Sequence, residues 1–239
     1  MRIVLLIAIL VLMIGQAGCT KRKSSGSEYA ASSSSDKGLS PAIDPARARV
    51  FLEQGKDLYK KDEDEKAAQA FETAIKLDPD LAEGFFRLGL ANDALAQKHE
   101  ADEAYKKAIE SYRKFIKANP KDGEAYYNLG QSYAGLHLYG EAANAYRQAT
   151  RLKADDADIY YDLGIALTRL AQYDEAASAF QKCLNIDPDN YRAQDALDEA
   201  REGSKRIKTG RKYAEDQLKK QQEEEKKKQQ NANTPQTQG

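Results

Sequence analysis

The chain has 239 residues, with 37 Lys and Arg against 38 Asp and Glu, and 41% of its residues are hydrophobic. Its net charge of −1 gives no overall attraction for a polyanion, so we expect no nucleic-acid partner. Two Cys and two His are too few for a disulfide-rich scaffold or a His-based metal centre, so we expect no metal site and no cofactor.

The first segment, residues 1–18, has the layout of an export signal. Arg2 precedes an apolar run from Ile3 to Ile14, and small residues then lead to Cys19. The run is shorter than the ~20 residues that cross a bilayer, which favours removal of the leader over a permanent span. Without the leader the chain keeps 36 Lys and Arg against 38 Asp and Glu, a net charge of −2.

The end of the leader, Ala17-Gly18-Cys19, resembles the lipobox of bacterial lipoproteins, with Gln16 where that family prefers an aliphatic residue. The resemblance implies cleavage before Cys19 and lipidation of its thiol. Thr20, in place of Asp, implies an outer-membrane anchor that faces the periplasm. Two alternatives stay open: cleavage after Ala17, which leaves Cys19 as a free thiol on a soluble chain, or an uncleaved anchor with the folded part in the cytoplasm. The basic run Lys21-Arg22-Lys23 favours the latter.

Residues 19–47 are expected to form a lipidated, disordered tether. The stretch Ser24 to Ser40 reads SSGSEYAASSSSDKGLS and offers too little apolar surface to offset the entropy of ordering it. Such a tether holds a folded part near a membrane without fixing its orientation.

A repeated pattern follows, marked by Gly55, Gly89, Gly130 and Gly164 at spacings of 34, 41 and 34 residues. Aromatic residues precede each glycine by four positions and follow it by sixteen, and an alanine follows by twelve. These landmarks resemble the tetratricopeptide repeat (TPR). The aromatic and alanine landmarks are Phe51, Phe85, Tyr126, Tyr160; Phe71, Tyr105, Tyr146, Phe180; and Ala67, Ala101, Ala142, Ala176.

Each repeat holds two amphipathic helical patterns, and one such hairpin cannot bury its apolar faces alone. We therefore predict an all-α fold, a TPR α-solenoid of four helical hairpins over residues 48–190. The predicted units are residues 48–81, 82–122, 123–156 and 157–190. The second unit is seven residues longer than the 34-residue repeat, and its apolar pattern continues, which predicts a long second helix from Glu100 to Ala118.

After the repeats, residues 191–229 are expected to form a capping helix that continues into a charged helical tail. Ala193, Leu197 and Ala200 mark the capping face, whereas Gly203 and Gly210 interrupt the apolar stripe further on. Residues 230–239 are expected to be disordered.

No pattern of catalytic residues is found, so we expect a protein that is not an enzyme and has no small-molecule substrate. His99 and His137 fall in predicted turns, away from any Cys/His cluster of metal spacing. Cys183 occupies the place of a small packing residue, where the other units have alanine.

The TPR resemblance implies a concave surface, lined by the first helix of each unit, that binds segments of other proteins. Carried over to this chain, its aromatic or apolar stripe is Leu52, Phe86, Tyr127 and Tyr161, beside Arg49 and an acidic column of Glu83, Glu124 and Asp158. Further groove candidates are Lys56, Tyr59, Lys60, Leu90, Gln131, Ile165 and Arg169. A stripe and column of this kind suit a peptide with apolar and basic residues.

These features predict a non-enzymatic scaffold or assembly factor, tethered to the bacterial cell envelope, that captures a segment of another protein. The alternative is a structural envelope protein that oligomerises through its charged C-terminal helix. The aromatic residues also allow a simpler interpretation, in which they pack between adjacent first helices and bind nothing.

Overall fold

A computed structural model describes residues 43–232 of the chain. The leader, Cys19 and most of the expected tether lie outside the described residues, as do residues 233–239. The described residues form nine helices and no strand, which confirms the predicted all-α class.

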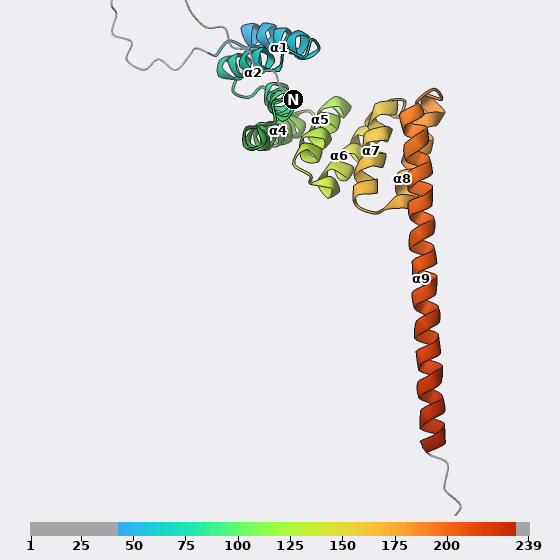
Figure 1. The fold of residues 1–239 in the computed structure, drawn as a ribbon. Coiled ribbons are helices and arrows are strands. Elements are labelled where there is room, and N and C mark those ends of the chain that lie inside the picture. Colours follow the sequence, from blue (N-terminus) through green and yellow to red (C-terminus); the bar gives the residue numbers. More distant parts are fainter. Residues whose placement is uncertain (1–42, 233–239) are drawn as a thin grey trace, which may run out of the picture. The chain divides into compact units, whose positions relative to one another are not determined.

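The first eight helices form four hairpins that follow one another along the chain (Figure 1). Each helix packs on the helix before it and the helix after it, as expected of a solenoid. The hairpins are α1 (Pro45–Tyr59) with α2 (Asp64–Leu77), α3 (Ala82–Ala94) with α4 (Lys98–Ala118), α5 (Gly123–Gly135) with α6 (Tyr139–Leu152), and α7 (Ala157–Arg169) with α8 (Tyr173–Ile186).

Two helix starts differ from the sequence prediction. The side chain of Asp44 accepts a hydrogen bond from the Arg47 amide at 3.0 Å and caps α1, so the end of the expected 19–47 tether is helical. The long helix of the second unit is confirmed as α4, but it begins at Lys98. The prediction that His99 falls in the turn before this helix is therefore wrong, because His99 lies in the first turn of α4.

A close contact between a glycine and an aromatic ring recurs in every hairpin. A Cβ atom added to Gly55, Gly89, Gly130 or Gly164 would lie 2.5 Å from a ring carbon of the aromatic residue sixteen positions later. These rings belong to Phe71, Tyr105, Tyr146 and Phe180, each at most 2% exposed. The recurring glycine thus lets the second helix of each hairpin approach the first closely, and the ring fills the space between them.

The turn inside each hairpin contains one residue in the left-handed region. The four residues are Asp62, Ala96, His137 and Ala171, with φ of 57° or 58°. In the second hairpin the amide of Gln97 donates to the Asn92 carbonyl at 2.8 Å and so closes the end of α3. His137 lies in its turn as predicted.

Small residues make up much of the buried core, because alanines at the helix crossings let neighbouring backbones approach. Cys183 is fully buried at one of these positions, which confirms its predicted packing role. Burial raises the pKa of its thiol and keeps the reactive thiolate scarce.

The last helix, α9 (Tyr191–Ala232), packs on α8 through Ala193, Leu197 and Ala200, as predicted for a cap. It continues without a break through both glycines. Gly203 does not weaken the contact, because it lets α9 approach the ring of Tyr173, to which an added Cβ would lie at 2.6 Å. The helix extends to Ala232, into the segment expected to be disordered.

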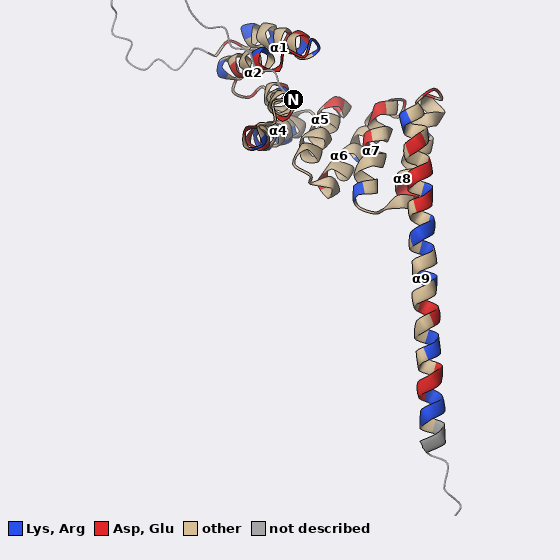
Figure 2. Cartoon of the chain, in the orientation of Figure 1, with Lys and Arg blue, Asp and Glu red and all other residues tan. Residues whose placement is uncertain are grey.

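Beyond Ser204 no described side chain of α9 is buried, and basic and acidic groups alternate along it (Figure 2). Three large apolar side chains of this part are well exposed: Ile207 at 42%, Tyr213 at 67% and Leu218 at 55%. The C-terminal part of α9 keeps an ion pair with α8, between Lys208 Nζ and an Asp174 carboxylate oxygen at 2.9 Å, and is otherwise largely exposed.

We expect Gly130→Ala to lower the free energy of unfolding by about 1–3 kcal/mol, because the new methyl group would overlap the ring of Tyr146. Urea denaturation followed by circular dichroism measures this change.

Gly140→Ala is the matched control, since Gly140 lies in α6 with no atom within 4 Å of an added Cβ. Alanine there should stabilise the helix by up to about 1 kcal/mol. Equal stability of the two variants would contradict the role given to the glycine–ring contact.

Candidate functional site

The predicted stripe on the first helices does not form one continuous surface. Leu52 is only 4% exposed and Phe86 only 2%, whereas Tyr127 and Tyr161 are half-buried. The side chains at this register turn toward the second helix, where the ring centroids of Tyr127 and Tyr146 lie 5.8 Å apart. The expectation of an open aromatic stripe is therefore wrong for the first two positions, because Leu52 and Phe86 are buried in the core.

The predicted acidic column is largely neutralised by neighbouring side chains. A carboxylate oxygen of Glu83 lies 3.3 Å from both Lys56 Nζ and Arg87 Nε. A carboxylate oxygen of Glu124 lies 2.8 Å from Lys153 Nζ. Only the third acid, the exposed Asp158, has no ion pair among the residues that the structure describes. Arg49, beside the column, is exposed.

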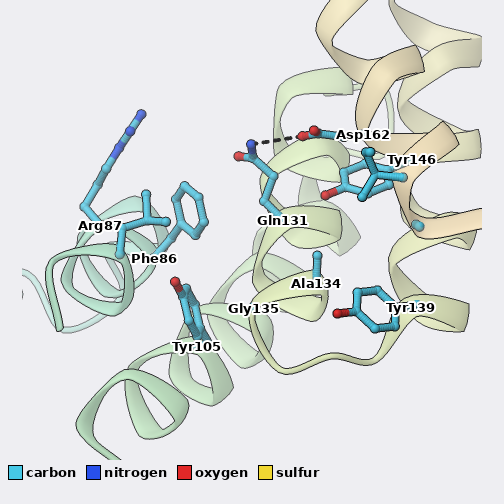
Figure 3. Close-up of a pocket in the computed structure, with 12 residues that line it drawn as sticks. Phe86, Arg87, Tyr105, Gln131, Ala134, Gly135, Tyr139, Tyr146 and Asp162 are labelled. Carbon is cyan, nitrogen blue, oxygen red and sulfur yellow. Dashed lines mark hydrogen bonds between the residues drawn. The ribbon is translucent and has the colours of Figure 1, made fainter. Parts of the chain in front are cut away.

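A hollow of about 300 Å³ lies where α3, α5 and α7 come together. It gathers four of the predicted groove residues, namely Phe86, Leu90, Gln131 and Ile165. Most of its wall is apolar, and the hydroxyl group of Tyr146 and the amide of Gln131 are seen at its edge (Figure 3). Other predicted groove residues lie outside this hollow: Leu52, Lys56, Tyr59, Lys60, Glu83, Glu124, Tyr127, Asp158, Tyr161 and Arg169.

The structure adds Asp162 to the hollow, a residue that the sequence interpretation missed. Its Oδ2 atom accepts hydrogen bonds from Tyr127 Oη at 3.0 Å and from Gln131 Nε2 at 3.3 Å. Gln131 Nε2 also donates to Tyr127 Oη at 3.0 Å, so the three side chains form one small network. The matching positions of the other units hold Glu, Arg and Asn, so no recurring residue type could have identified Asp162.

Burial dominates the electrostatics of this carboxyl group. It raises the pKa of Asp162, because the charged form loses water, whereas the hydrogen bonds from Tyr127 and Gln131 act in the opposite direction. Burial and the nearby carboxylate also raise the pKa of Tyr127, so its hydroxyl stays protonated and donates.

The cations nearest to Asp162 are engaged elsewhere. Arg87 also lines the hollow, but its Nε atom lies 3.3 Å from a carboxylate oxygen of Glu83. Arg192 Nη2 donates to Tyr161 Oη at 3.2 Å, and its guanidinium lies 4.7 Å from the centre of that ring. Within residues 43–232, no Lys or Arg forms an ion pair with Asp162.

Neither a metal-binding cluster nor a membrane-spanning helix is found among the described residues. No group of three or more His, Cys, Asp or Glu side chains in this part of the chain could hold a metal ion. None of the helices between residues 43 and 232 is both long and apolar enough to cross a membrane.

The repeats match four family models, described as tetratricopeptide repeat (residues 128–191, 111–143 and 82–115) and TPR repeat (residues 55–95). A crystal structure of MamA protein is 27% identical with a TM-score of 0.50, and the match covers 75% of this chain and 94% of that one.

Two other solved structures show a similar fold at 20% identity. The structure described as MamA MSR-1 C2 has a TM-score of 0.50 and coverages of 65% and 86%. The structure of the APC/C hetero-tetramer Cut9-Hcn1 has a TM-score of 0.53 and coverages of 64% and 30%. No curated protein matches the sequence. The family matches and the hairpin geometry together show that the solenoid of this chain is built from tetratricopeptide repeats.

Proposed function

We propose that this protein is a non-enzymatic scaffold or assembly factor that binds a segment of another protein in its concave groove. The observation that carries the proposal is the hollow between α3, α5 and α7, where three repeats contribute to one surface. Its apolar wall offers burial to side chains of a partner, and its few polar groups offer orientation.

The size of the hollow supports a peptide segment over a small molecule. Its volume of about 300 Å³ lies at the lower limit of typical small-molecule pockets. A segment that runs across successive first helices would place one or two side chains in the hollow and contact the half-buried Tyr127 and Tyr161 beside it. Groove binding of this kind needs no catalytic group.

We further propose that a lipid on Cys19 tethers the solenoid to the bacterial envelope, at the outer membrane on its periplasmic side. The lipobox-like end of the leader supports this, as does the polar composition of the segment that follows. A tether raises the effective concentration of the groove near membrane-bound partners without any added contact.

A second candidate function is structural, with oligomerisation through α9. Its supporting observation is the exposure of Ile207, Tyr213 and Leu218 on a helix that has no buried side chain beyond Ser204 among the described residues. Helices that expose apolar side chains between charged ones can pair with further helices.

The intact mass of the mature chain from a bacterial membrane fraction tests the tether. We expect a diacyl or triacyl adduct on a chain that begins at Cys19, and its loss in Cys19→Ala. An unmodified chain that begins at Gly18 contradicts lipidation. A chain that retains Met1 indicates the uncleaved anchor and contradicts cleavage and lipidation at Cys19.

Site-specific photo-crosslinking in living cells tests the groove. A photoreactive residue at Leu90, in the hollow, should give a discrete adduct with another protein. The control position is Lys107, which is exposed on α4 and outside the hollow. Adducts at Lys107 but not at Leu90 would contradict the concave groove as the binding surface.

Light scattering on the mature chain, with and without residues 207–239, tests the structural candidate. Loss of α9 beyond Arg206 removes all three exposed apolar side chains, so an oligomer held by α9 should become a monomer. A monomer in both preparations eliminates oligomerisation through α9.

A further inference from the structure

We propose that the concave hollow selects its partner segment by a Lys or Arg side chain, whose cationic group binds the carboxylate of Asp162. This inference rests on the proposed groove function and adds the chemistry of the residue that is recognised. The neighbouring apolar wall would hold the aliphatic stem of that side chain and an apolar residue beside it.

The first step is the unequal use of the two carboxylate oxygens. Oδ2 of Asp162 accepts both hydrogen bonds, from Tyr127 and Gln131. Oδ1 accepts no hydrogen bond from any residue that the structure describes. It is also not among the enclosed polar atoms without a partner, so this oxygen is exposed to solvent, and Asp162 is one of the residues that line the hollow. One acceptor of the site is thus satisfied, and one remains open to a donor.

The second step is that no Lys or Arg side chain of the described residues forms an ion pair with Asp162. A carboxylate that is largely removed from water costs free energy unless a cation or several donors compensate it. Arg87 and Arg192 are engaged with Glu83 and Tyr161. The charge of Asp158 raises the pKa of Asp162 and the charge of Arg192 lowers it, but no Lys or Arg of the described residues forms an ion pair with this carboxylate. A cationic side chain of a partner would supply that ion pair.

The third step is that the fold does not need this charge. An asparagine at residue 162 could accept the same two hydrogen bonds through its side-chain oxygen, and it would carry no charge to desolvate. Burial raises the pKa of Asp162, which means that the folded chain disfavours the ionised form. A charge that the fold disfavours is a candidate for binding rather than for stability.

The fourth step is the kind of cation. No metal-binding cluster is found in the described residues, and the hollow has only one carboxylate among its lining residues. Phe86, Leu90 and Ile165 line the hollow with Asp162 and provide apolar surface for a methylene stem. Gln131 and Tyr146 add further polar groups that a guanidinium or ammonium could contact. An organic cation on an apolar stem fits this lining better than an inorganic ion.

The test is a synthetic peptide array probed with the full-length mature chain. Each peptide carries a central residue between apolar neighbours, and that residue is Arg, Lys, citrulline, Gln or Glu. Citrulline keeps the shape of Arg without its charge. We expect Arg and Lys peptides to retain about tenfold more protein than citrulline and Gln peptides.

Asp162→Asn should remove this preference, whereas Asp57→Asn should keep it. Asp57 is the control, because it is an exposed acid on α1, loses the same charge and lies outside the hollow. The thermal unfolding midpoint of Asp162→Asn should not fall below that of the unchanged chain, since the substitution removes a charge that the fold disfavours.

Equal retention of Arg and citrulline peptides by the unchanged chain would overturn the inference, whether or not Asp162→Asn folds. In that case apolar peptides still held by the groove would leave the proposed function standing. Failure to retain any peptide would contradict both. A last outcome would also overturn the assignment to a peptide: putrescine, a free amine, displaces the Arg peptides, and it displaces them equally from the unchanged chain and from a Leu90→Ala variant. The apolar wall would then contribute nothing to binding, and a free amine would be the ligand.

Discussion

The approach of a glycine to an aromatic ring fixes the geometry of every hairpin. Because Gly130 has no side chain, the ring of Tyr146 lies against the backbone of α5, and the same arrangement recurs in the other three hairpins. This contact sets how close the two helices of a unit lie. The stacking of units depends on this distance between the two helices of a hairpin, because first helices line one surface when the distance is similar in successive hairpins. The hollow between α3, α5 and α7 is a product of that regularity.

The chemistry of the concave surface comes from the residues that depart from the repeat. Glu83 and Glu124 each have a Lys or Arg partner, so the acids that seemed suited to a basic partner from their positions alone are largely neutralised. Asp162 differs because its neighbours supply hydrogen bonds, whereas no Lys or Arg of the described residues forms an ion pair with it. The binding potential of the groove therefore rests more on one partly buried carboxylate and an apolar wall than on a row of surface charges.

The two ends of the chain serve the solenoid in different ways. At the C-terminal end α9 covers α8 through small residues, and Gly203 lets it approach Tyr173. Beyond Ser204 no described side chain of the helix is buried, although Lys208 pairs with Asp174 of α8. The continuity of the helix there reflects the helix-forming Lys, Gln and Glu residues that dominate this part. At the N-terminal end of the described residues Asp44 caps α1. The lipid tether proposed for Cys19 precedes it.

The all-α class, the four hairpins, the long α4 and the burial of Cys183 followed from the amino-acid sequence alone, because periodic apolar residues and a recurring glycine dictate which faces must be covered. The sequence also identified four residues of the hollow, Phe86, Leu90, Gln131 and Ile165, from their register in the repeat. The burial of Leu52, the ion pair between Glu83 and Lys56 and the central place of Asp162 became visible only in the folded chain. Asp162 meets Gln131 and Tyr127 from 31 and 35 positions away in the chain, and no local pattern specifies such a contact.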